Sequence, residues 1–155
     1  MEYLVRAARV TDIDRLVALS DSALVMDPGA STRHAADLLR QLVYLPQASI
    51  FVAEARRVVV GGAVLALRPS VRASGYVGTI DLLVVDPDPE HDAARITDAL
   101  LEEVVRSASN KGCTLVEAIG PDDPAASERW TAQGFVPSGP RLQRPVAAAG
   151  IARRT

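Results

Sequence analysis

Apolar and polar residues in the second half of the chain follow two different periodicities. Residues 75–85 form a run of β-branched and apolar side chains, which is typical of a strand, and an acidic, proline-rich turn at residues 86–89 ends it. Apolar residues then recur at helical spacing over residues 93–108. A short apolar run at residues 114–118 and a second helical stretch, which ends at Gly134-Phe135, follow. The pattern predicts strand, helix, strand and helix in this order.

The first half predicts a strand, two helices and a hairpin. The expected elements are a strand at residues 3–8, a helix from residue 11, a helix from residue 31 or 32 to 45, and strands at residues 49–54 and 58–67. Thr11 and Asp14 have the spacing of a capping box for the first helix. Residues 55–57 suit a hairpin connection, and Gly61-Gly62 predicts a bulge or close packing in the second hairpin strand.

The end of the chain is rich in residues that interrupt regular structure. Pro137, Gly139, Pro140 and Pro145 follow the last predicted helix, so any final strands are expected to be short. No linker long enough to separate two domains is present. We therefore predict one domain over residues 1–146 and a flexible tail over residues 147–155.

Composition and charge narrow the class of function. The net charge is −2, which argues against a general nucleic-acid binder because such proteins need a dense basic face. No apolar run is long enough for a membrane span, and the single Cys113 cannot form an internal disulfide, which favours a cytoplasmic location. His34 and His91 lack the spacing of metal ligands, so no metal site is expected. Abundant arginine with a single lysine suggests a high-GC bacterial genome.

The predicted order, βααββ-βαβα-β, resembles the GCN5-related N-acetyltransferases over about residues 3–145. The opening residues Arg6-Ala7, Thr11-Asp12 and Leu16 are similar to the first strand and helix of that family. The resemblance implies an α/β (α+β) fold with a mixed sheet of six to seven strands and about four helices. It also implies transfer of an acyl group from acetyl-CoA, or another acyl-CoA, to an amine in a direct ternary complex.

The resemblance further implies where the coenzyme binds. The family places its pantetheine arm along the fourth strand, here Leu83, Val84 and Val85, and its pyrophosphate on the helix that follows. The family loop, Arg/Gln-x-x-Gly-x-Gly/Ala, corresponds to Asp92 through Thr97. The other cofactor-binding positions implied are Ala93, Ala94, Arg95, Ile96, Thr97, Asp123 and Ala126. Arg95 either pairs with phosphate or fills the space of the missing glycine. The alternative for Asp92 is an ordinary N-cap, which needs no ligand.

Two residues, Asp81 and Trp130, occupy positions that are catalytic in the family. Asp81 lies in an otherwise apolar strand, where the family places a general base, although it could equally point outward or pair with Arg68 or Arg72. Trp130 replaces the tyrosine that protonates the departing thiolate. An indole N–H cannot act as that acid, and the alternative for Trp130 is a hydrophobic anchor between helix and sheet.

Three functions stay open at this point. The first is an N-acyltransferase acting on a small-molecule or peptide amine, with an acceptor pocket near residues 26–32, His34 and Tyr44. The second is a binding or regulatory module that has lost catalysis, in which Asp92, Arg95 and Trp130 stand in place of residues that the family uses. The third is a scaffold for a homodimer. Neither a nucleic acid nor a membrane is an expected partner.

Overall fold

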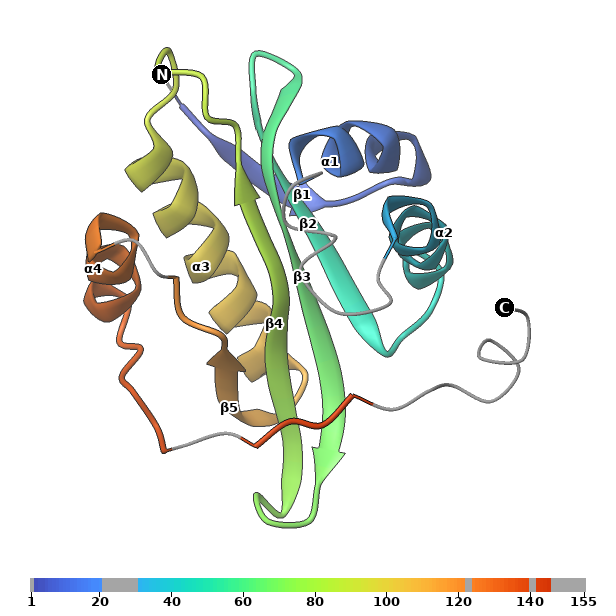
Figure 1. Ribbon diagram of the computed structural model, residues 1–155, viewed down its shortest axis with the longest axis vertical. Coiled ribbons are helices and arrows are strands. Elements are labelled where there is room, and N and C mark those ends of the chain that lie inside the picture. Colours follow the sequence, from blue (N-terminus) through green and yellow to red (C-terminus); the bar gives the residue numbers. More distant parts are fainter. Residues whose placement is uncertain (1, 21–30, 122–123, 140–141, 146–155) are drawn as a thin grey trace.

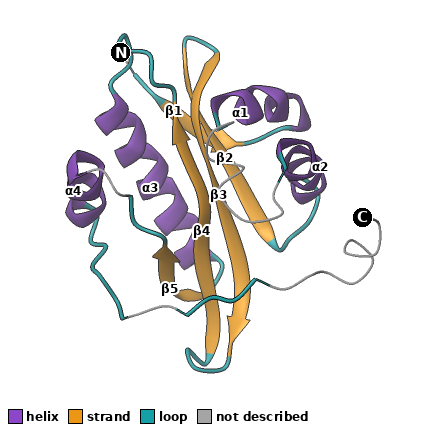
Figure 2. Cartoon of the chain, in the orientation of Figure 1, coloured by secondary structure: helices purple, strands orange, loops and turns teal. Residues whose placement is uncertain are grey.

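The computed structural model describes residues 2–20, 31–121, 124–139 and 142–145. A five-stranded sheet lies in the middle of the fold, with α1 and α2 on one face and α3 and α4 on the other (Figures 1 and 2). The strands are β1 (Leu4–Ala7), β2 (Ala48–Ala55), β3 (Val58–Ser70), β4 (Gly75–Val85) and β5 (Cys113–Ala118). The helices are η1 (Val10–Asp12), α1 (Ile13–Leu19), α2 (Thr32–Leu42), α3 (Ala93–Asn110) and α4 (Pro124–Ala132).

The sheet follows the chain order from β1 to β5. The first four strands are antiparallel neighbours, whereas β4 and β5 are parallel and are connected through α3. The predicted order of elements is confirmed as far as α4. The sixth and seventh strands are not found, because residues 133–139 and 142–145 contain no strand. Proline lacks the N–H group that a central ladder requires, so Pro137 and Pro145 disfavour strand pairing there.

Each face of the sheet has its own apolar core. On one face, α3 buries a stripe at helical spacing against β2, β3 and β4, formed by Ile96, Leu100, Leu101, Val104 and Ala108. On the other face, Ile13 and Leu16 of α1 and Leu39 of α2 pack on Ile50 and Val64. None of the helices within the described residues has the length and apolar character of a membrane span.

Two consecutive glycines in β3 let both helical layers approach the sheet. A Cβ atom on Gly61 would lie 2.9 Å from the Val84 carbonyl oxygen and 2.9 Å from Ile96 Cγ2, while one on Gly62 would lie 2.4 Å from Leu16 Cδ1. The register also shifts opposite this point, between Ala53 and Glu54. The structure therefore shows both the close packing and the irregularity that the glycine pair predicted.

We expect Gly61→Ala to lower the free energy of unfolding by about 1–3 kcal/mol, the usual cost of overpacking. The new methyl group would clash with the backbone of β4 as well as with a buried side chain of α3, and a backbone cannot move aside cheaply. Urea denaturation measures the change. Gly75→Ala is the control, because a Cβ atom added there would lie more than 4 Å from every atom outside its two neighbouring residues. Equal stability of the two variants would contradict this account of the packing.

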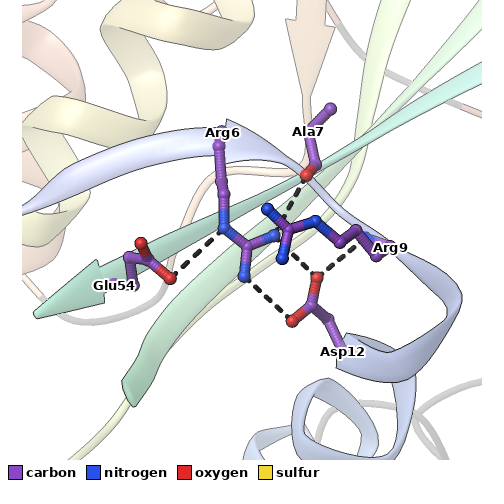
Figure 3. Close-up of polar contacts among 5 residues, drawn as sticks. All are labelled: Arg6, Ala7, Arg9, Asp12 and Glu54. Carbon is purple, nitrogen blue, oxygen red and sulfur yellow. Dashed lines mark hydrogen bonds and ion pairs between the residues drawn. The ribbon is translucent and has the colours of Figure 1, made fainter. Parts of the chain in front are cut away.

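The connection from β1 to α1 is fixed by an arginine and carboxylate cluster (Figure 3). The Arg6 guanidinium donates to both carboxylate oxygens of Asp12, at 2.8 and 3.0 Å, and its Nε donates to Glu54 at 3.2 Å. The Arg9 N–H donates to Asp12 at 2.7 Å. The predicted capping box of Thr11 and Asp14 is therefore wrong. The carboxylate that closes the turn is Asp12, because a short 3-10 helix precedes α1 and moves the cap towards Arg9.

The hairpin between β2 and β3 has an unusual two-residue turn. Ala55 pairs with Val58, and Arg56 and Arg57 between them have φ values of 51° and 67°. Positive φ at both positions is the pattern of a type I′ turn, which favours Asn-Gly. For a residue with a Cβ atom, this left-handed conformation costs about 1–2 kcal/mol. The predicted hairpin is confirmed, but at a strained turn.

Candidate active site where β4 and β5 part

The parallel strands β4 and β5 are paired over only half the length of β4. Pairing runs from Tyr76 and Cys113 to Ile80 and Ala118, and β4 then continues to Val85. Figure 1 shows β5 beside the lower part of β4 only. The predicted parallel pairing is thus confirmed. β5 ends at Ala118, where its pairing with β4 also ends, so β4 continues beyond Ile80 without β5 beside it. No described strand pairs with the β5 side of residues 81–85, so the backbone groups of that edge have no strand partner among the described residues.

Asp81 lies at the point where the strands part. Leu82 pairs with Val64 and Ile80 pairs with Leu65, so Asp81 is the extra residue of a β-bulge. Bulges reorient a side chain and are common next to active sites. Asp81 is exposed, and no described residue forms an ion pair or hydrogen bond with it. Of the two partners considered, Arg68 instead donates to Glu117 at 2.9 Å. The outward orientation considered from the sequence is therefore the one found.

The last three residues of β4 offer backbone rather than side chains. Val84 is buried against α1 and α2, whereas Leu83 and Val85 pack partly buried on the core under α3. Their opposite sides follow from the alternation of a strand. Any contact with an extended ligand along this edge would therefore come from the N–H and C=O groups of β4.

The N-terminus of α3 is capped by the side chain of Asp92, the residue just before the helix. The Asp92 carboxylate accepts a hydrogen bond from the Arg95 N–H at 3.2 Å, and the Asp92 N–H donates to the Tyr3 hydroxyl at 2.8 Å. The N-cap interpretation of Asp92 is confirmed. Ile96 is fully buried and its N–H donates to the Asp92 carbonyl, so Ile96 has no group left for a ligand. Within the described part of the chain, the N–H groups of Ala93 and Ala94 have no acceptor.

Arg95 is held by an aromatic ring at the start of the chain. Its guanidinium carbon lies 5.6 Å from the centroid of the Tyr3 ring, which is within the range of a cation–π contact. Sequence reasoning missed Tyr3 as part of this region, because nothing in the local pattern connects residue 3 with residue 95. The sequence does show that Arg95 replaces the first glycine of the family loop. In the structure, the partner of Arg95 is the Tyr3 ring.

The loop before α3 is acidic and ordered by its own carboxylates. The Asp88 N–H donates to Asp86 at 3.0 Å, and the Glu90 N–H donates to Asp88 at 2.9 Å. Asp86 also forms an ion pair with Arg15 of α1 at 2.9 Å. Asp88, Glu90 and Asp92 have no such cationic partner among the described residues. A phosphate at this helix terminus would therefore meet unfavourable charge.

His91 belongs to the same loop and lies beside Asp86. Its Nε2 lies 3.7 Å from Asp86, and its Nδ1 is buried without a hydrogen-bond partner in the described part of the chain. No cluster of three or more potential metal ligands occurs among the described residues.

Trp130 connects α4 to the core below α3. Its ring contacts Phe135 edge to face at 5.1 Å, and both side chains are partly buried against the α3 core. The ion pair of Arg129 with Asp98, at 3.3 Å, also joins α4 to α3. This environment fits the anchor interpretation of Trp130. Ala126 lies half-buried on α4, whereas Asp123 lies outside the described residues.

The predicted acceptor pocket is only partly described. Residues 26–30 lie outside the described part of the chain, His34 is exposed on α2, and Tyr44 is 73% exposed beyond the end of that helix.

The sequence matches no protein-family model and no curated protein, but the fold is shared with solved structures. A predicted acetyltransferase from Clostridium acetobutylicum, solved with acetyl-CoA, is 16% identical, with a TM-score of 0.73 over 93% of this chain and 96% of that one. Glucosamine-6-phosphate N-acetyltransferase from Arabidopsis thaliana is 13% identical, with a TM-score of 0.71 over 95% and 100%. A transcriptional regulator from Bacillus halodurans is 18% identical, with a TM-score of 0.74 over 94% and 100%.

These likenesses concern the fold. The fold that the resemblance implied is confirmed from β1 to α4, since structures named acetyltransferases share it over nearly the whole chain.

Proposed function

We propose that the protein is an acyl-CoA-dependent N-acyltransferase, with acetyl-CoA as donor and an amine as acceptor. The observation that carries this proposal is the parting of β4 from β5 beside an exposed bulge carboxylate, Asp81. The shared fold with proteins named acetyltransferases supports the class of reaction. A fold alone does not establish an activity, so the proposal rests on the site.

The chain supplies two elements of a direct transfer. The unpaired edge of β4 at Leu83 and Val85 would align the thioester by main-chain hydrogen bonds, as an added strand. Asp81 would accept the proton of the attacking ammonium, directly or through water, because its carboxylate is exposed beside that edge. The amine nitrogen then forms the bond to the acyl carbon as the carbon–sulfur bond breaks. The sulfur leaves as the coenzyme A thiolate, and the second proton of the nitrogen passes to that thiolate or to solvent. Trp130 anchors α4 on the core under α3 and would not supply the proton for the leaving sulfur.

The start of α3 would bind the pyrophosphate of the coenzyme less strongly than the edge of β4 would bind the arm that carries the thioester. Two amides, from Ala93 and Ala94, and the dipole of α3 would attract a pyrophosphate. The acidic loop opposes this attraction, and Arg95 would have to leave its contact with Tyr3 to help. We therefore expect weak coenzyme affinity for the native protein.

A binding or regulatory module is the second candidate. The self-capped α3 terminus favours it, because the chain satisfies with Asp92 an amide that a phosphate would otherwise use. The likeness to a protein named a transcriptional regulator is compatible with this role. Calorimetric titration with acetyl-CoA, followed by thiol release in the presence of a panel of amines, separates the two. Binding with turnover supports the enzyme, whereas the absence of any binding supports the module.

We expect Asp92→Asn to tighten acetyl-CoA binding by roughly three- to tenfold, since a carboxylate about 5 Å from a phosphate charge costs on the order of 1 kcal/mol or more. Asparagine keeps the N-cap hydrogen bond and removes only the charge. Calorimetry measures the affinity. Asp88→Asn is the matched control in the same loop and should change it less. Weaker binding by Asp92→Asn would show that the carboxylate itself contributes to the site.

A further inference from the structure

The tip of the β2–β3 hairpin carries two adjacent arginines that the described chain does not use. Arg56 and Arg57 are both exposed, and neither forms an ion pair or hydrogen bond with another described residue. Figure 1 places this turn at the same end of the sheet as the loop that precedes α3. An unpaired pair of guanidinium groups attracts oxyanions, because each presents a planar fork of donors.

The backbone of the turn gives a second, independent observation. Both arginines adopt the left-handed conformation, which Asn-Gly would adopt with much less strain. Backbone strain of this kind is concentrated at ligand sites and switch regions. The turn therefore retains residues that oppose its own stability, and a ligand contact would account for them.

A concave surface lies directly against the turn. It has a volume of about 430 Å³ and is lined by Glu2, Leu4, Glu54, Arg56 and Arg57. This volume lies within the range of small-molecule sites, roughly 300–1,000 Å³. Glu54 is already paired with Arg6 at 3.2 Å, so the two turn arginines outweigh the remaining carboxylate, Glu2. Leu4 is 58% exposed and provides an apolar wall.

We infer that this concavity binds the phosphate group of a small phosphomonoester. The two guanidinium forks hold the phosphate oxygens, and the Glu2 carboxylate accepts a hydrogen bond from a neighbouring hydroxyl of the ligand. Glu2 adjoins Tyr3, which contacts the start of α3. The 3′-phosphate of coenzyme A and a separate phosphorylated molecule both carry this phosphomonoester chemistry.

The test follows amide chemical shifts of Leu4, Arg56 and Arg57 while the full chain is titrated with inorganic phosphate. Native protein is expected to show saturable shifts in the millimolar range. The Arg56→Asn, Arg57→Gly variant is expected to bind at least tenfold more weakly, yet to unfold at a temperature a few degrees higher, because Asn-Gly suits the turn. A second double variant, Arg56→Gln, Arg57→Gln, removes both charges but does not introduce the favourable Asn-Gly turn. We expect it to bind phosphate as weakly as the first double variant.

Arg72→Asn is the matched control, since Arg72 is an exposed arginine in the turn between β3 and β4, at the opposite end of the sheet (Figure 1). Its phosphate binding should equal that of the native protein. Coenzyme A and the same molecule without its 3′-phosphate identify the source. If the native protein binds coenzyme A more tightly than the molecule without the 3′-phosphate, and the glutamine variant does not, the site belongs to the coenzyme. If glycerol phosphate still binds in the presence of coenzyme A, the site belongs to a separate ligand. Absence of saturable native shifts, or equal binding by the glutamine variant, overturns the inference.

Discussion

Asp81→Asn is expected to lower turnover on an amine by roughly 10² to 10⁴, the usual contribution of a positioned general base. Asparagine keeps the size and the polarity of the bulge residue but cannot accept the proton of the ammonium. The affinity for acetyl-CoA should stay nearly constant, because the carboxylate lies outside the proposed phosphate contacts. Steady-state kinetics at saturating acetyl-CoA and calorimetry measure the two quantities separately.

The control for this prediction is Asp37→Asn, which alters another exposed carboxylate, on α2, where it pairs with Arg40 at 3.1 Å. Its turnover should match that of the native protein. An undiminished rate for Asp81→Asn at saturating amine would show that solvent or another group takes the proton. An equal loss of coenzyme affinity would instead make Asp81 a binding residue.

Asp12→Ala is expected to lower the free energy of unfolding by about 2–4 kcal/mol, since it leaves a partly buried arginine without its main partner. The Asp12 side chain is only 11% exposed and receives hydrogen bonds from Arg6 and from the Arg9 N–H. Urea denaturation near neutral pH measures the loss. Asp14→Ala is the matched control, because Asp14 forms an ion pair of the same 2.8 Å length with Arg40 but is 88% exposed. Exposed pairs of this kind contribute about 0–1 kcal/mol.

The same cluster predicts how stability depends on pH. The hydrogen bond from Arg6 holds the pKa of Asp12 below its ordinary value. A carboxyl group with a lowered pKa stabilises the fold above the pKa that it has in the unfolded chain. This stabilisation is lost as the pH falls through the pKa of the folded state. The native protein and Asp12→Ala should therefore converge in stability under acidic conditions, and a constant difference down to low pH would contradict this assignment.

Much of the fold can be predicted from interactions between residues that are close in the sequence. The helical spacing of Ile96, Leu100 and Val104 places α3 on the sheet, and the strand run that ends at Val85 marks β4. Asp92 is an N-cap by residue type and position, and it acts as one. These features depend on contacts within a few residues, so a sequence pattern carries them. The number of strands was predicted less well, because a final strand needs a distant partner as well as a suitable sequence.

The candidate site depends more on distant contacts. The sequence left Asp81 as a general base, as an outward-pointing residue or as a partner of Arg68 or Arg72. Only the register of β3 against β4 shows the bulge at which it is exposed. Tyr3 reaches Asp92 across 89 positions of the chain, and it also contacts Arg95. Similarly, the capping role of Asp12 depends on Arg6 and on Glu54 of β2. No local pattern encodes these pairings.

The sequence by itself determined the order of strands and helices up to α4, the presence of the β2–β3 hairpin and the cap of α3, because each follows from hydrophobic periodicity or capping. The two-residue length of the hairpin turn was not among these, since the sequence predicted a connection of residues 55–57. Only the tertiary structure decided where β4 and β5 part, which way Asp81 faces, and which partners hold Arg6 and Arg95. The physical reason is that register, bulges and ion pairs between separate strands are selected by packing across the whole sheet.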